Sequence, residues 1–180
     1  GLIPAGRLGG GPSIQGQGKY KIDAGHSTTI YNGETVKISS GYVVGGNGSA
    51  ADIVGVLNGI FFNAATTLKP TFSNFYKATI TPANSEDTTA FVMDDPFQQY
   101  VVGADDATGV TTMLKTYDMN TSAGSDTTGK SSSTLNIGVT GANDKQFRLL
   151  RSAEDPENED ATAAFASVIV VSNTNSFNQV

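Results

Sequence analysis

The stretch from Tyr31 to Phe62, YNGETVKISSGYVVGGNGSAADIVGVLNGIFF, constrains the fold more than any other part of the chain. Val36 and Ile38 alternate with polar residues, which is the period-two pattern of a half-buried strand. Ser-Ser-Gly then predicts a turn, and the strand resumes at 42–44. After a glycine-rich loop, residues 53–62 carry a long apolar run in which Asn58-Gly59 fits a bulge or a hairpin turn. This order predicts a β-meander that ends in a buried strand.

The composition extends this prediction to the whole chain. The 180 residues include 21 glycines and are 38% hydrophobic but only 16% charged. Many short strands separated by turns suit such a balance, so we expect an all-β fold, a β-barrel or β-sandwich of short antiparallel strands. The length fits a single β domain over residues 19–180, preceded by an extended N-terminal arm over residues 1–18.

The arm, GLIPAGRLGGGPSIQGQG, is rich in glycine and proline, which predicts neither a helix nor a regular strand. It carries more apolar side chains than a solvated linker needs. We therefore expect it to become ordered on a neighbouring subunit, with Leu2, Ile3, Pro4, Arg7 and Leu8 as the partner-binding residues and Arg7 available for a carboxylate. A disordered tail is the alternative. Removal of residues 1–18 is expected to leave the β domain folded.

Further strands are predicted from β-branched and aromatic runs that end at turn residues. They cover 19–22, 28–31, 77–81, 89–93, 97–102, 135–139, 146–151 and 163–171. The continuous VIVV at 168–171 predicts a central strand that is buried on both faces. Residues 63–76 are expected to form a loop pinned by aromatics, 110–120 a short helix or turn, and 121–133 a polar loop. The predicted core is Val36, Ile38, Val54, Val56, Ile60, Phe62, Phe91, Ile137, Leu149, Val168 and Val170.

Charge and residue counts exclude several classes of function. The net charge is −6 and no basic run exists, which argues against binding to nucleic acid. No apolar run reaches the roughly 18 residues of a membrane span. The absence of cysteine excludes disulfides, thiolate nucleophiles and thiolate metal sites.

No motif predicts an enzyme, and no metal or cofactor site is expected. The one histidine, His26, lies in a glycine-flanked turn, and no nucleophile elbow accompanies it. The carboxylate doublets 94–95 and 105–106 point to opposite faces of a strand, so neither supplies a glycosidase pair. The acidic loop 154–160 lacks the spacing of an EF-hand, and a solvated loop is the expected state.

Four stretches, taken in order, resemble a known family. They are LIPAGRLGGGP followed by KYKI, then IYNGETVKISSGYVV with IVGVLNGIFF, then FVMDDPFQQYVV, and finally FRLLRSAEDPENEDATAAFASVIVVSNTNSF. Their succession is similar to that of the capsid decoration proteins of tailed bacteriophages, also called cement or head stabilisation proteins.

The resemblance implies a viral structural protein on the outer surface of the capsid in the virion. Its partners would be the major capsid protein and neighbouring copies of itself in a homotrimer. A ligand that binds only the assembled shell stabilises that shell, and this role needs no active site. Two alternatives remain open. One is another virion β-protein such as a knob, fibre base or receptor-binding module, and the other is a bacterial surface or carbohydrate-binding module.

Overall fold

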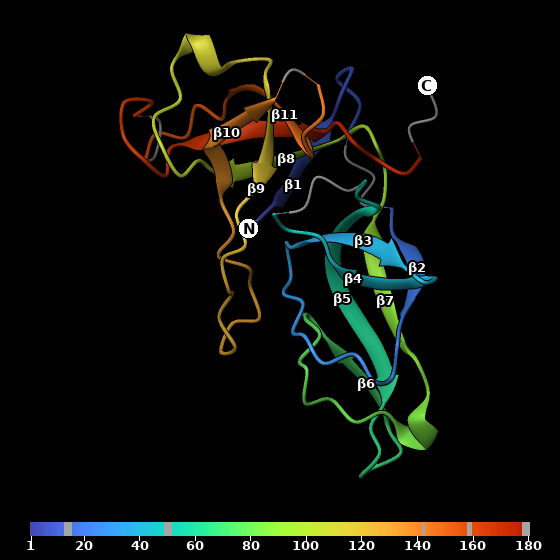
Figure 1. Ribbon diagram of the computed structural model, residues 1–180. Helices are drawn as coiled ribbons and strands as arrows, with labels where there is room; N and C mark the ends of the chain where they lie inside the picture. The colour runs from blue at the N-terminus through green and yellow to red at the C-terminus, as the bar shows by residue number, and fades with distance from the viewer. Residues whose placement is uncertain (13–15, 49–51, 142, 158–159, 178–180) are drawn as a thin grey trace.

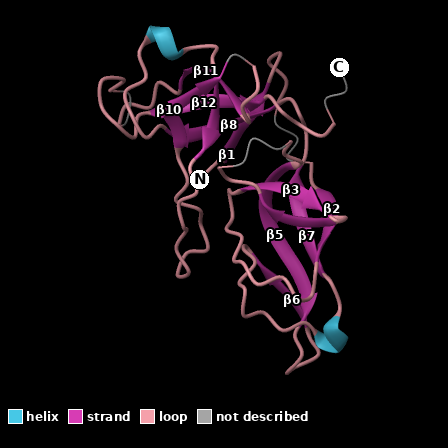
Figure 2. Ribbon diagram, in the orientation of Figure 1, coloured by secondary structure: helices cyan, strands magenta, loops and turns pink. Residues whose placement is uncertain are grey.

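Two antiparallel β-sheets make up the fold (Figures 1 and 2). The computed structural model describes residues 1–180 except 13–15, 49–51, 142, 158–159 and 178–180. The predicted all-β class is confirmed, and the arrangement is sandwich-like rather than a closed barrel. Two short 3₁₀ helices, η1 (Ala83–Ser85) and η2 (Val110–Thr112), are the helical elements among the described residues.

Sheet A lies at the top of Figure 1 and has six strands in the order β1-β8-β12-β11-β9-β10. Their bounds are β1 (Ile3–Arg7), β8 (Gln98–Gly103), β12 (Ser167–Ser172), β11 (Phe147–Ser152), β9 (Thr116–Met119) and β10 (Leu135–Gly141). All six residues of β12 are buried and the strand is interior to the sheet, which confirms the prediction for VIVV.

Sheet B lies below sheet A in Figure 1 and has the order β2-β7-β5-β3-β4, with β6 paired to the second half of β5. Its strands are β2 (Gly18–Ile22), β7 (Thr88–Met93), β5 (Gly55–Asn63), β3 (Thr35–Ser39), β4 (Tyr42–Gly45) and β6 (Pro70–Ser73). The predicted strands at 28–31 and 77–81 are wrong, because these segments lack a continuous partner strand. The first contributes only an isolated bridge from Ile30 to Tyr76.

The predicted meander is wrong in its connection. The β3–β4 hairpin forms as expected around Ser40 and Gly41, which both have positive φ. However, β5 pairs with β3 and not with β4. The long apolar strand thereby lies between β3 and β7, where both of its edges find partners. The register with β7 shifts between Leu57 and Gly59, so the Asn-Gly pair forms a bulge.

Two hydrophobic clusters fill the molecule, one centred on each sheet. Most of the predicted core is buried: Val36, Val54, Val56, Ile60, Ile137, Leu149, Val168 and Val170. The prediction that Ile38 lies in the core is wrong, since 41% of its surface is exposed. Strand β3 pairs with β5 only at Thr35 and Val36, so Ile38 lies in the part of the β3–β4 hairpin beyond β5. Phe62 is only partly buried against the sheet B cluster, and Phe91 is half-buried on the opposite face of that sheet.

The N-terminal segment departs most from expectation. Ile3–Arg7 is a β-strand paired with β8, and Leu2 is only 3% exposed in the cluster of sheet A. The free edge of β8 supplied a partner that the local sequence could not reveal. A register shift between Pro4 and Gly6, and an edge position for Pro4, let the strand tolerate its composition. Residues 3–7 therefore belong to sheet A, and the expectation that the N-terminal segment contains no strand is wrong.

Loop 121–133 joins the two sheets. It leaves β9 and runs down the side of sheet B (Figure 1). Asn32 donates its N–H to the carbonyl of Gly129 at 2.9 Å, and its own carbonyl accepts from Ser131 at 2.8 Å. The Lys77 ammonium lies 3.1 Å from the Asp126 carboxylate. The predicted polar loop thus serves as a strap between sheets A and B.

Candidate functional site

The residues expected to bind a partner divide into two groups. Leu2 is buried in the core of its own chain, and Pro4 is half-buried on β1. The Arg7 guanidinium lies 3.0 Å from the Asp95 carboxylate and 5.6 Å from the centre of the Phe97 ring. Leu2 and Arg7 are thus used within the chain. Their assignment to a neighbouring subunit stays a prediction, which these contacts within the chain do not support.

Ile3 and Leu8 remain exposed at the two ends of β1. Ile3 is 62% exposed, and Leu8 donates its N–H to the carbonyl of Phe97, whose ring is also exposed. Leu8 and Phe97 lie side by side at the edge of sheet A, and we name these two residues, with Ile3 at the other end of β1, the N-terminal patch. Exposed apolar side chains that gather in this way mark interaction sites.

The backbone of β1 is poorly suited to adding a further strand. Leu2 donates its N–H to Gly33 at 2.9 Å, Arg7 donates to Gly11 at 3.3 Å, and Pro4 has no N–H to offer. Such features protect an edge strand from pairing with another chain. A partner at the N-terminal patch would therefore be held by side-chain contacts.

A second apolar surface lies on the outer face of sheet B. Phe61 on β5 stands directly opposite Phe72 on β6, and the ring centroids of Phe72 and Phe91 are 5.8 Å apart. Phe72 is 66% exposed. Its ring lies over Gly59, where an added Cβ would come within 2.9 Å of the ring. We name Phe61, Phe72 and Phe91 the aromatic face.

Two lysines on β2 flank the aromatic face. Lys19 pairs with Phe91 across the β2–β7 ladder, and Lys21 pairs with Thr89, to whose hydroxyl its ammonium donates at 3.1 Å. Directly opposed residues lie on the same face of a sheet. The aromatic face therefore combines exposed rings with positive charge.

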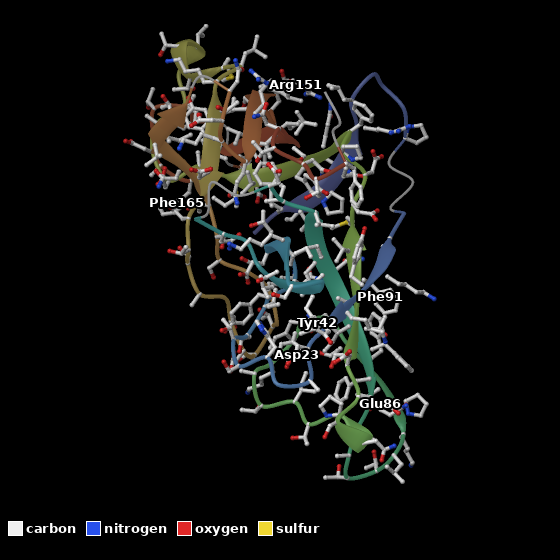
Figure 3. The ribbon with its side chains drawn as sticks, turned by 45° about the vertical axis from the view of Figure 1, so that its right-hand side comes forward. Asp23, Tyr42, Glu86, Phe91, Arg151 and Phe165 are labelled. Atoms are coloured by element: carbon white, nitrogen blue, oxygen red, sulfur yellow. The ribbon has the colours of Figure 1, made fainter. Side chains whose placement is uncertain are left out.

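Figure 3 shows Phe91 in the sheet B half of the molecule, far from Phe165 in the sheet A half.

Sequence reasoning missed the aromatic face, although a signal was present. Adjacent residues of a strand face opposite sides, so Phe61 and Phe62 could not both enter the core. Which of them is outside depends on the register with β6 and β7. The prediction of a loop over 63–76 is wrong in part, because Pro70–Ser73 pairs with β5 as strand β6. The aromatic anchors of the segment are Tyr76, which is buried, and Phe75, which stacks on Tyr31 at 5.8 Å. Leu68 and Phe72 in the same segment are exposed.

The candidate catalytic groups have structural partners. His26 packs on Tyr76 at 5.5 Å between ring centroids, and burial lowers its pKa. Asp94 accepts a hydrogen bond from the Tyr20 hydroxyl at 2.7 Å. Asp105 accepts from the Ile137 N–H at 2.7 Å, while Asp106 accepts from the N–H of the residue that follows it. The two doublets thus hold loops and strand ends in place.

Across the described part of the chain, no three His, Cys, Asp or Glu side chains gather closely enough to hold a metal ion. The acidic loop lies partly outside the described residues. In its described part, the Asp160 carboxylate accepts the N–H of Thr162, and the Asp155 carboxylate accepts the N–H of Glu157. None of the described helices has the length and hydropathy to cross a membrane. Comparison with known proteins finds no matching family, no similar curated protein and no similar solved structure.

Proposed function

We propose that this chain is a viral structural protein, a decoration protein that binds the outer surface of a shell of major capsid protein and stabilises it. The observation that carries the proposal is the pair of exposed apolar surfaces on separate sheets, the N-terminal patch on sheet A and the aromatic face on sheet B. A protein that must contact both a shell and a neighbouring copy of itself needs two such surfaces.

The aromatic face suits the shell contact. Phenylalanine rings supply large contact area at a low cost in side-chain entropy, and Lys19 and Lys21 add charge that can meet carboxylates of the partner. The N-terminal patch suits contact between copies in a homotrimer. The net charge of −6 disfavours contact with the packaged genome, because both are negatively charged. This charge is consistent with a position on the outside of the virion.

The test is co-sedimentation of the purified chain with expanded, undecorated phage heads, scored as copies bound per capsid protein. Saturation at a fixed ratio is expected. Phe72→Ser should reduce the affinity by about 30-fold, the effect of losing a central aromatic contact worth roughly 2 kcal/mol. Because Phe72 is largely exposed, its replacement should leave the folded state intact.

Val110→Ser is the matched control. Val110 is 89% exposed on η2, which lies at the top of Figure 1 while sheet B lies at the bottom, so shell binding through the aromatic face should be unchanged. Absence of wild-type binding to heads, with the chain folded, would refute the decoration role. Equal losses of affinity for the heads in Phe72→Ser and Val110→Ser would refute the assignment of the aromatic face as the shell-binding surface.

A further inference from the structure

An open cavity of about 400 Å³ lies where loop 121–133 meets sheet B. Its walls come from the segment that leads into β3, from the end of β4 and from the first residues of the loop. Most of the lining side chains carry a hydroxyl, an amide or a carboxyl group: Thr28, Tyr31, Glu34, Asn47, Thr121 and Ser122. The volume falls in the range of small-ligand sites, and such sites often lie between structural units.

One carboxyl group, that of Glu34, lines this cavity. Its Oε2 accepts the N–H of Tyr31 at 2.9 Å, and its own backbone carbonyl accepts the N–H of Leu57 on β5 at 2.9 Å. Burial raises the pKa of Glu34 to about 7, against the effect of the Tyr31 hydrogen bond, which lowers it. A carboxyl group in this position is poorly solvated, and none of the salt bridges among the described residues involves it.

No lysine or arginine is found among the described residues that line the cavity. Asp126, which accepts from the hydroxyl of the lining residue Tyr31 at 2.8 Å, is itself paired with Lys77. Ionised Glu34 therefore gives the cavity a negative charge that nothing in its wall offsets. This charge favours a positively charged occupant and disfavours an anion.

The walls of the cavity are fixed in place. Asn47 donates to the Ser133 hydroxyl at 2.6 Å and accepts from the hydroxyl and N–H of Thr35. The Tyr31 ring is stacked on Phe75, with 4° between their planes. Side chains held by such contacts lose little entropy when a ligand enters. The site is thus preformed.

We propose that this cavity binds an ammonium or guanidinium group, carried by a lysine or arginine side chain of a partner protein, with the Glu34 carboxylate as its counter-ion. The hydroxyl groups of Thr28, Thr121 and Ser122 supply neutral oxygen acceptors for the remaining N–H donors. A single carboxylate is a poor set of ligands for Ca²⁺ or Mg²⁺, which require several hard oxygen ligands. The inference does not depend on the partner being a capsid protein.

Binding of this kind is linked to protonation. Only the ionised carboxylate pairs with the cation, so affinity rises with pH through about 7 and then levels off. From pH 5.5 to pH 8 the ionised fraction of Glu34 increases about 30-fold, and the affinity should increase by a similar factor. Bound cation should in turn lower the pKa of Glu34.

The experiment titrates the full chain with methylguanidinium and with n-butylammonium, followed by amide chemical shifts and by the carboxyl ¹³C shift of Glu34. Saturable shifts of cavity residues are expected, stronger at pH 8 than at pH 5.5, with a drop in the Glu34 pKa when ligand is present. The ¹³C measurement uses the wild-type chain, so it does not depend on whether a variant folds. Glu34→Gln should lose both the binding and its pH dependence.

Glu86→Gln is the control, since Glu86 is an exposed carboxylate outside this cavity, and it should bind like wild type. No saturable binding of either cation would overturn the proposal. So would binding that persists unchanged in Glu34→Gln, or an unmoved Glu34 pKa in saturating ligand. A Ca²⁺ titration runs in parallel, and saturation of the cavity by Ca²⁺ without response to the organic cations would assign the site to a metal instead.

Discussion

Gln146 is the side chain whose loss should most weaken the junction of the two sheets. It lies just before β11 of sheet A and is fully buried. Its Nε2 donates to the carbonyl of Gly46, at the end of sheet B, at 2.6 Å, and its Oε1 accepts from the Met119 N–H at 3.0 Å. Gln146→Ala removes both bonds and leaves two buried backbone groups without a partner.

The expected cost follows from these contacts. A buried donor or acceptor left unsatisfied costs about 1–3 kcal/mol, and two are created. The space vacated by the side chain adds a smaller cavity term. Gln146→Ala should therefore lower the free energy of unfolding by roughly 2–6 kcal/mol, which is a large part of the roughly 5–15 kcal/mol typical of a domain.

Urea unfolding followed by far-ultraviolet circular dichroism at 25 °C measures this loss, and the denaturant slope should be checked for constancy. Gln17→Ala is the control, because Gln17 is exposed, and its change should stay within about 0.5 kcal/mol. A loss below about 1 kcal/mol for Gln146→Ala, or one equal to that of Gln17→Ala, would refute the inference that Gln146 joins the sheets.

Three further outcomes are expected. Leu2→Ala should lower the free energy of unfolding by about 2–5 kcal/mol, as for other buried leucines, measured by the same urea titration. Deletion of residues 1–8 should abolish cooperative unfolding in a thermal scan, because it strips a strand from sheet A; a normal transition would show that β1 is dispensable. For Glu34, the folded-state pKa of about 7 exceeds the ordinary value of 4.5, so the folded state binds the proton more tightly. Wild-type stability should therefore fall as pH rises from about 4.5 to about 7, by roughly 2 kcal/mol after allowance for partial exposure, and Glu34→Gln should lack this fall.

Period-two alternation and turn chemistry determined much of the fold in advance. The β3–β4 hairpin, β7, β8, β10, β11 and the buried central strand β12 follow from short runs of β-branched and aromatic residues that end at Gly, Pro, Asn or Asp. The 3₁₀ turn η2 lies inside the segment 110–120, where a short helix or turn was expected, although strand β9 occupies residues 116–119 of that segment. These features depend on neighbours in the chain, so the local sequence contains their causes.

The candidate site was less accessible from the sequence. Exposed apolar residues near the N-terminus were expected, and Ile3 and Leu8 are exposed, but Leu2 and Arg7 have partners in distant parts of the same chain. The aromatic face depends on the register of β5 against β6 and β7, since a slip of one residue would bring Phe62 outward in place of Phe61.

The sequence by itself determined that the chain forms many short strands with alternating faces, because strand period and turn preferences are set by residues close together in the chain. Only the tertiary structure decided which strands became neighbours. The free edge of β8 recruited Ile3–Arg7, and both edges of β5 found partners in β3 and β7. Strand pairing depends on hydrogen-bonding edges and apolar surfaces that residues far apart in the chain supply, so no local pattern encodes it.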